Sequence, residues 1–217
     1  MLEKWLEVQS LSIVFVGEFN PVIISPAWLT LKNLIREEEA INAKVDVIHN
    51  EIVQYDLDWV LVTLNKKRCE FRSSKVPYFD AVRDLAASIF KILKETPITS
   101  VGLNHIFELI LPDEETYYRF GAKLTDLRLW ENDLVDPRIM NLEILELNRK
   151  DGLPGNYRIR ISPSGRGVKF GVDININDHI DLKSFSNDAP RTIFENWEKT
   201  FERSKRITNN FITNMKL

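Results

Sequence analysis

Hydrophobic and polar residues alternate along several stretches of this chain. Every second residue is apolar over residues 168–176, and residues 157–161 follow the same alternation. Successive side chains of a strand point to opposite faces of a sheet, so this pattern predicts strands with one covered and one uncovered face. Such half-buried strands are typical of antiparallel sheets, because parallel strands covered on both faces carry continuous apolar runs.

Two longer stretches have apolar residues at steps of three and four. Residues 78–96 carry one such stripe, and residues 191–215 carry the other, which includes Trp197 and Phe201. A single apolar stripe predicts a helix that packs on one face of a sheet. The patterns together predict an α+β protein, in which a mainly antiparallel sheet carries long helices on one face.

The predicted elements occur in the same order twice. In residues 12–97 a strand and a helix precede three β-rich runs and the first long helix, at 12–19, 27–39, 44–57, 59–65, 68–76 and 78–96. In residues 100–216 the corresponding elements are 100–111, 114–125, 140–148, 156–162, 168–181 and 191–215. Residue identity between the halves is low, so a duplication rests on element order alone, which chance can also produce. The order resembles saddle and helix-grip folds and predicts a single compact domain, residues 1–217, of two β-α-β-β-β-α pseudo-repeats.

Composition and length fit a cytoplasmic protein with a sizeable core. The chain has 217 residues, of which 44% are hydrophobic and 28% charged. We find no unbroken apolar run near the roughly 18 residues that a membrane span needs. The first ten residues carry acids where a signal peptide has a basic segment. The single cysteine, Cys69, excludes an internal disulfide and is either a core residue or a reactive thiol.

The common catalytic and cofactor motifs are absent. The chain has no GxSxG, HExxH, paired CxxC or P-loop. Residues 173–178 imitate the start of a calcium loop, but Asp178 stands where the loop needs glycine, so an alternating strand explains them better. Residues 165–171 have glycines between two strands, which predicts a hairpin turn and no phosphate site. We expect no metal and no cofactor.

Three histidines, His49, His105 and His179, are available for acid–base chemistry. His179 is the best candidate, because Asp178 and Asp181 flank it near the end of a predicted strand, where an imidazole can face a cleft. His105 shares a strand face with apolar residues, which favours a core position. An enzyme with a cleft between the two halves, using His179 as acid or base, is therefore an alternative function.

Charge is distributed unevenly along the chain. The net charge is −3, but residues 149–169 carry a net +5 and residues 113–136 a net −4. Such separation can steer a charged partner or align copies of the protein head to tail, although an ordinary solvated surface explains it equally well. If Arg158, Arg160 and Lys169 share the uncovered sheet face, they form a basic stripe suited to an acidic protein or a phosphate backbone.

A short apolar loop is the other candidate contact surface. Two prolines bracket Ile23 and Ile24, and Trp28 follows; the loop is either tucked into the core or presented to a partner. The leading hypothesis is a non-catalytic protein-binding or assembly module of a soluble, bacterial-type multisubunit complex, with a protein partner or self-association. Nucleic-acid binding on the open sheet face is a second alternative, which the acidic overall charge disfavours.

Overall fold

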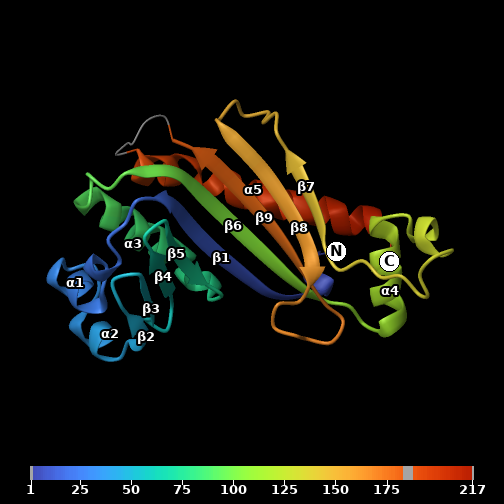
Figure 1. The fold of residues 1–217 in the computed structure, drawn as a ribbon, viewed down its shortest axis with the longest axis horizontal. Coiled ribbons are helices and arrows are strands. Elements are labelled where there is room, and N and C mark those ends of the chain that lie inside the picture. The colour runs from blue at the N-terminus through green and yellow to red at the C-terminus, as the bar shows by residue number, and fades with distance from the viewer. Residues whose placement is uncertain (1, 183–187, 217) are drawn as a thin grey trace.

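The computed structural model describes residues 2–182 and 188–216, and its strands form one nine-stranded antiparallel sheet (Figure 1). The strand order is β2-β3-β4-β5-β1-β6-β9-β8-β7. The strands are β1 (Leu6–Gly17), β2 (Lys44–Ile48), β3 (Ile52–Asp56), β4 (Leu61–Asn65), β5 (Arg68–Ser73), β6 (Ile98–Ile110), β7 (Leu142–Glu146), β8 (Gly155–Pro163) and β9 (Gly171–Asp181). The helices are α1 (Pro26–Leu31), α2 (Glu37–Ile41), α3 (Phe79–Ile92), α4 (Glu114–Leu124) and α5 (Ala189–Met215), and one short 3₁₀ turn, η4 (Leu127–Trp130), follows α4. The predicted α+β class and antiparallel sheet are confirmed.

Three predicted elements differ from the structure. Residues 44–57 form two strands, β2 and β3, so five strands precede α3 and four follow it. The helix expected over residues 27–39 is divided into α1 and α2 where Asn33 adopts a left-handed φ of 57°. The last strand begins at Gly171 and not at Val168, because Phe170 has a φ of 59°, which no strand residue adopts.

The central strands β1 and β6 pair along nearly their whole length. Their antiparallel register runs from Leu6 opposite Leu109 to Gly17 opposite Ile98. On its other side β1 pairs with β5, and β6 pairs with β9. This one pairing therefore joins the strands from the two parts of the chain into a single sheet.

The long helices α3 and α5 cover one face of the sheet (Figure 1). Apolar residues that alternate along the central strands, such as Phe15 and Leu103, are buried beneath them in a large core. A second core at the other end of the sheet includes Phe107, Ile174 and Ile212. Because α5 has 27 residues, it is long enough to contribute to both cores. Within the described residues, no helix is long and apolar enough to span a membrane.

A buried ion pair ties α5 to the sheet. Arg149 donates to one carboxylate oxygen of Asp178 at 2.6 Å, and Thr200 of α5 donates to the other at 2.7 Å. The side chains of Arg149 and Asp178 are each 1% exposed. Arg149 also donates to both oxygens of Asp151, at 2.9 and 2.7 Å, and its guanidinium lies against the ring of Tyr157. The segment before β8, strand β9 and α5 therefore meet at one charged cluster.

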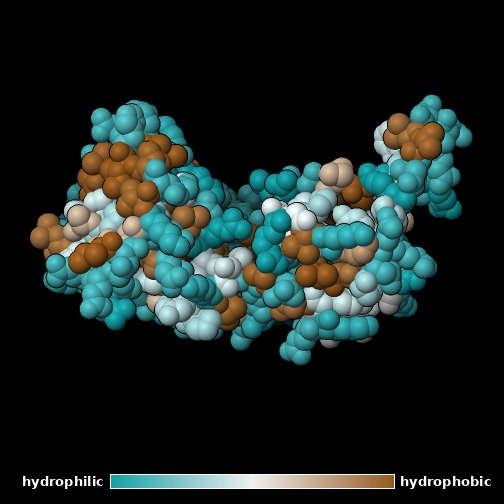
Figure 2. Space-filling model, turned by 90° about the horizontal axis from the view of Figure 1, so that it is seen from below, coloured by the Kyte–Doolittle hydropathy of each residue, from teal (hydrophilic) through white to brown (hydrophobic). Residues whose placement is uncertain are grey.

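On the opposite sheet face, no helix of the described ranges lies over the central strands. Figure 1 looks onto this open face, with α5 behind the sheet. Figure 2, seen from below, shows the same molecule with two raised ends and a hollowed middle between them. The covered face of the central strands holds the core, whereas their open face is accessible.

We expect Asp178→Ala to lower the free energy of unfolding by about 3–5 kcal/mol, because it leaves Arg149 buried with part of its charge uncompensated. Urea denaturation measures the change. The matched control is Asp181→Ala on the same strand, where the side chain is 59% exposed and the expected change is below about 0.5 kcal/mol. Equal losses in the two variants would contradict a structural role for the buried pair.

Candidate functional site

A hollow of about 480 Å³ lies in the middle of the open face, over β1, β6, β9 and β8. Its floor is formed by Val14 and Val16 of β1 and by Gly102 of β6, of which Val16 is exposed while Val14 and Gly102 are buried. The surrounding side chains are basic or carry amides, apart from Glu143: Arg68, Arg158, Arg160, His179, Asn104, Asn156, Asn175 and Asn177. These residues alternate along the strands with core residues, which is why a single sheet presents both surfaces.

Two of the amides in the hollow satisfy each other, and two do not. Asn177 donates through Nδ2 to Oδ1 of Asn104 at 2.7 Å, and Asn104 donates to the carbonyl of Ser12 at 3.2 Å. The Oδ1 atoms of Asn156 and Asn175 are buried, yet they accept no hydrogen bond from any residue that the structure describes. A buried acceptor without a donor costs free energy, and an N–H donor from outside would satisfy either oxygen once its amide turned toward the hollow.

Two guanidinium groups of β8 point into the same hollow without a carboxylate partner. Arg158 and Arg160 are two residues apart on the strand and are both exposed. Arg160 donates to Oδ1 of Asn141 at 3.2 Å, and across the described ranges neither arginine forms an ion pair. Arg68, by contrast, is neutralised by Glu70 at 2.7 Å. The free positive charge of the hollow therefore comes from Arg158 and Arg160.

Lys169 does not line this hollow. It lies in the turn between β8 and β9, with its ammonium 4.8 Å from the ring centroid of Phe170. The left-handed Phe170 separates Lys169 from the alternation of β9. The basic stripe expected from the sequence is thus shortened to Arg158 and Arg160.

The structure separates the two acidic neighbours of His179. Its Nε2 lies 3.1 Å from Oδ1 of Asp181 at the edge of the open face. Asp178 lies on the covered face, where Arg149 and Thr200 occupy its carboxylate. The hollow is lined by no serine, threonine or cysteine among the described residues, so an imidazole base has no hydroxyl or thiol side chain there to activate.

His105 occupies the core, as its strand pattern predicts. Its ring packs edge-to-face against Phe201 of α5, with centroids 4.5 Å apart. Neither ring nitrogen has a hydrogen-bond partner within the described part of the chain, which the sequence did not indicate. Burial, with a smaller contribution from Lys205, lowers the pKa of His105 from its usual 6.5 to about 3.

Two of the three candidates from the apolar loop pack inward. Ile24 is 2% exposed and belongs to the large core, and Trp28 packs against that core. Ile23 is 36% exposed, so it is the one of the three that a partner could reach. Cys69 is fully buried, and burial raises the pKa of its thiol well above the usual value, which agrees with the core interpretation.

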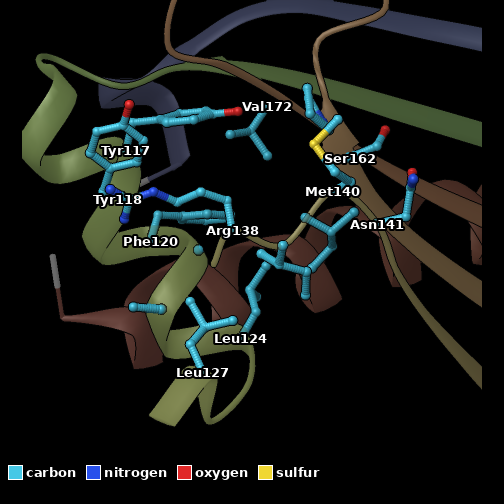
Figure 3. A pocket seen from close by; sticks show the side chains of 15 residues that line it. Tyr117, Tyr118, Phe120, Leu124, Leu127, Arg138, Met140, Asn141, Ser162 and Val172 are labelled. Carbon is cyan, nitrogen blue, oxygen red and sulfur yellow. The ribbon is translucent and has the colours of Figure 1, made fainter. Parts of the chain in front are cut away.

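A second cavity of about 220 Å³ lies beside α4 and is mostly apolar (Figure 3). Figure 3 shows side chains of α4, of the segment after it and of the sheet around one space, including Phe120, Leu124, Met140 and Val172. A guanidinium group lines this cavity. It belongs to Arg138, lies 3.7 Å from the ring centroid of Tyr118 and pairs with Asp136. The lining offers apolar contact and no group poised for acid–base chemistry.

At the other end of the open face, acidic residues dominate. Glu108 of β6 and Asp173 of β9 stand opposite each other in the register. Arg166, from the turn between β8 and β9, pairs with Glu108 at 2.6 Å. Burial, together with the charge of Glu108, raises the pKa of Asp173. The sequence patterns missed this cluster, because the register that aligns β6 with β9 is not visible in either strand alone.

The comparisons with known proteins assign no family. No family model matches the chain, and a search of curated proteins finds no significant match. Over the described residues, no group of three or more His, Cys, Asp or Glu side chains could hold a metal ion. The function must therefore be inferred from the hollow itself.

The buried imidazole should make stability depend on pH. Between about pH 6.5 and 3 the unfolded chain binds a proton at His105 and the folded protein does not, so acid favours unfolding. We expect the free energy of unfolding of the native protein to fall from pH 6 to pH 4 more steeply than that of His105→Phe, by up to about 1.4 kcal/mol per pH unit. Urea titrations at several pH values measure both slopes, and the exposed His49→Gln controls for loss of an imidazole. If the free energy of unfolding fell with pH equally steeply in the native protein and in His105→Phe, the buried imidazole would not be the cause of the pH dependence.

Proposed function

We propose that the protein is a non-catalytic binding module that holds an acidic protein segment in the hollow of its open sheet face. The observation that carries this proposal is the combination of two free guanidinium groups, on Arg158 and Arg160, with two unsatisfied amide oxygens, on Asn156 and Asn175. These groups face one space whose floor is apolar.

The donors and acceptors of the hollow match those of a peptide. Backbone N–H groups of an extended segment can donate to the oxygens of Asn156 and Asn175 once these amides turn toward the hollow. Side-chain carboxylates can accept from Arg158 and Arg160, and charge-assisted bonds of this kind are the stronger ones. An apolar side chain can contact Val16, which is exposed in the floor. Each feature of the hollow thereby has a complement in an acidic, partly apolar segment.

A nucleic acid is the second candidate, because guanidinium groups also bind phosphates. One observation favours the protein. The net charge is −3, whereas affinity for nucleic acid depends mainly on neutralised phosphates.

The internal duplication remains part of this proposal. The sheet order supports it, since β5 and β4 follow β1 outward on one side as β9 and β8 follow β6 on the other. Each set is followed along the chain by a long helix, α3 or α5. The extra edge strand β2 has no counterpart, so the saddle-like description applies to the central strands. A duplicated origin would account for a binding hollow at the junction of the two parts.

We expect a fluorescently labelled acidic peptide of alternating Glu and Val residues to bind the native protein and a Lys–Val peptide not to bind. Arg158→Glu with Arg160→Glu should weaken binding of the acidic peptide at least about tenfold, because two attractive charges become repulsive. Fluorescence anisotropy measures both affinities. The control replaces two exposed basic residues of α5, in Lys199→Glu with Arg206→Glu, and should bind normally.

The same titration distinguishes the second candidate. Duplex DNA that binds more tightly than the acidic peptide, with affinity falling steeply as salt rises and lost in the Arg158→Glu, Arg160→Glu variant, would replace the protein-segment proposal with nucleic-acid binding. If neither the peptide nor DNA binds to protein that light scattering shows to be monomeric, the hollow is not a site for charged segments.

A further inference from the structure

The segment after α4 forms a projecting tip at one end of the molecule. We define the tip as residues 126–138, which follow α4 in the yellow-green part of the chain in Figure 1 and include η4. Figure 2 shows this end raised above the hollowed middle, with apolar residues on its surface. Its exposed large apolar side chains are Leu129 (74% exposed), Trp130 (54%), Leu134 (51%) and Val135 (100%).

The tip also carries negative charge that the described part of the chain does not neutralise. Asp126 pairs with Arg128 at 2.8 Å, and Asp136 pairs with Arg138 at 2.6 Å. Glu131 and Asp133 are exposed and form no ion pair with any described residue. The tip thus presents two free carboxylates among exposed apolar side chains, which is uncommon for a surface that only water contacts.

The tip and the hollow are complementary in chemistry. The hollow presents two free guanidinium groups, Arg158 and Arg160, beside an apolar floor. The tip presents two free carboxylates, Glu131 and Asp133, beside exposed apolar residues. We infer that the tip of one copy of this chain docks in the hollow of a second copy. This inference rests on the proposed function and names the acidic segment that the hollow holds.

The arrangement of the two surfaces favours a closed dimer. In Figure 2 the tip rises on the same side as the open face on which the hollow lies. Two copies that face each other across a twofold axis can each place a tip in the hollow of the other. Such an arrangement repeats the same contact twice and leaves neither surface free, so association stops at two copies.

The docking would also give partners both to the exposed apolar side chains of the tip and to the amide oxygens of the hollow. Contact with exposed Val16 would remove apolar side chains of the tip from water, which is favourable in proportion to the apolar area removed. Backbone N–H groups of the tip can donate to the oxygens of Asn156 and Asn175 once these amides turn toward the hollow. The charges align the two copies and oppose other registers.

Charge exchange between two variants tests the inference. The hollow variant is Arg158→Glu with Arg160→Glu, and the tip variant is Glu131→Lys with Asp133→Lys. In a dimer of either variant, tip and hollow carry charges of the same sign at both contacts. We therefore expect the dimer of each variant to dissociate at least about 100-fold more readily than the native dimer. An equimolar mixture joins opposite charges at both contacts and should recover dimers, as should the variant that carries all four substitutions. Size-exclusion chromatography with light scattering, over a range of protein concentrations and at low and high salt, measures the mass.

Controls separate this docking from other outcomes. Glu37→Lys with Glu38→Lys makes the same change of charge on exposed residues of α2, and its dimerisation should equal that of the native protein. Circular dichroism checks that every variant is folded. A native protein that stays monomeric at all concentrations, or a mixture of the two variants that stays monomeric while native protein dimerises, would overturn the inference.

The same experiments distinguish failure of this inference from failure of the proposed function. A monomeric native protein that still binds the acidic peptide through Arg158 and Arg160 would keep the hollow as a site for a different protein and remove the tip as its occupant. Loss of both peptide binding and dimerisation would remove both proposals.

Discussion

The pairing of β1 with β6 is the constraint on which the rest of this structure depends. Both strands are long. On its outer side β1 pairs with β5, and β6 pairs with β9, so the backbone groups on the inner sides of β1 and β6 are satisfied only when these two strands pair with each other. The pairing joins five strands before α3 to four after it. It also creates the surface at the middle of the sheet, where Val14 of β1 and Gly102 of β6 form the floor of the hollow.

Because helices cover one face of the sheet and not the other, consecutive residues of a strand lie in opposite environments. Asp178 and His179 are consecutive, yet Asp178 is held in a buried ion pair and His179 stands at the edge of the open face. In β6, Asn104 lines the hollow while the next residue, His105, is buried against α5 with no polar partner among the described residues. The covered face therefore supplies stability, and the open face keeps polar and charged side chains accessible.

Tertiary structure also decided which charges of the chain are free. The basic run over residues 149–169 does not act as a unit, because Arg149 is buried against Asp178, Arg166 pairs with Glu108 and Lys169 lies in a turn. In the acidic run, Asp113 caps α4 by accepting from the backbone N–H of Thr116. Counting charge along the chain indicated that the surface is polarised, but it could not show that Asp178 and Glu108, which lie far away in sequence, pair with Arg149 and Arg166.

The sequence by itself determined the class of fold, since alternation with period two and stripes at steps of three and four specify half-covered strands and the helices that cover them. It also indicated that His105 is a core residue and that Arg158 and Arg160 share a face. The sequence could not determine that Asn156 and Asn175 meet around one hollow, that Asp178 binds Arg149, or that residues 126–138 project as a tip. These features depend on strand register and on contacts between distant segments, and such contacts are set by the packing of the whole chain and not by any local pattern.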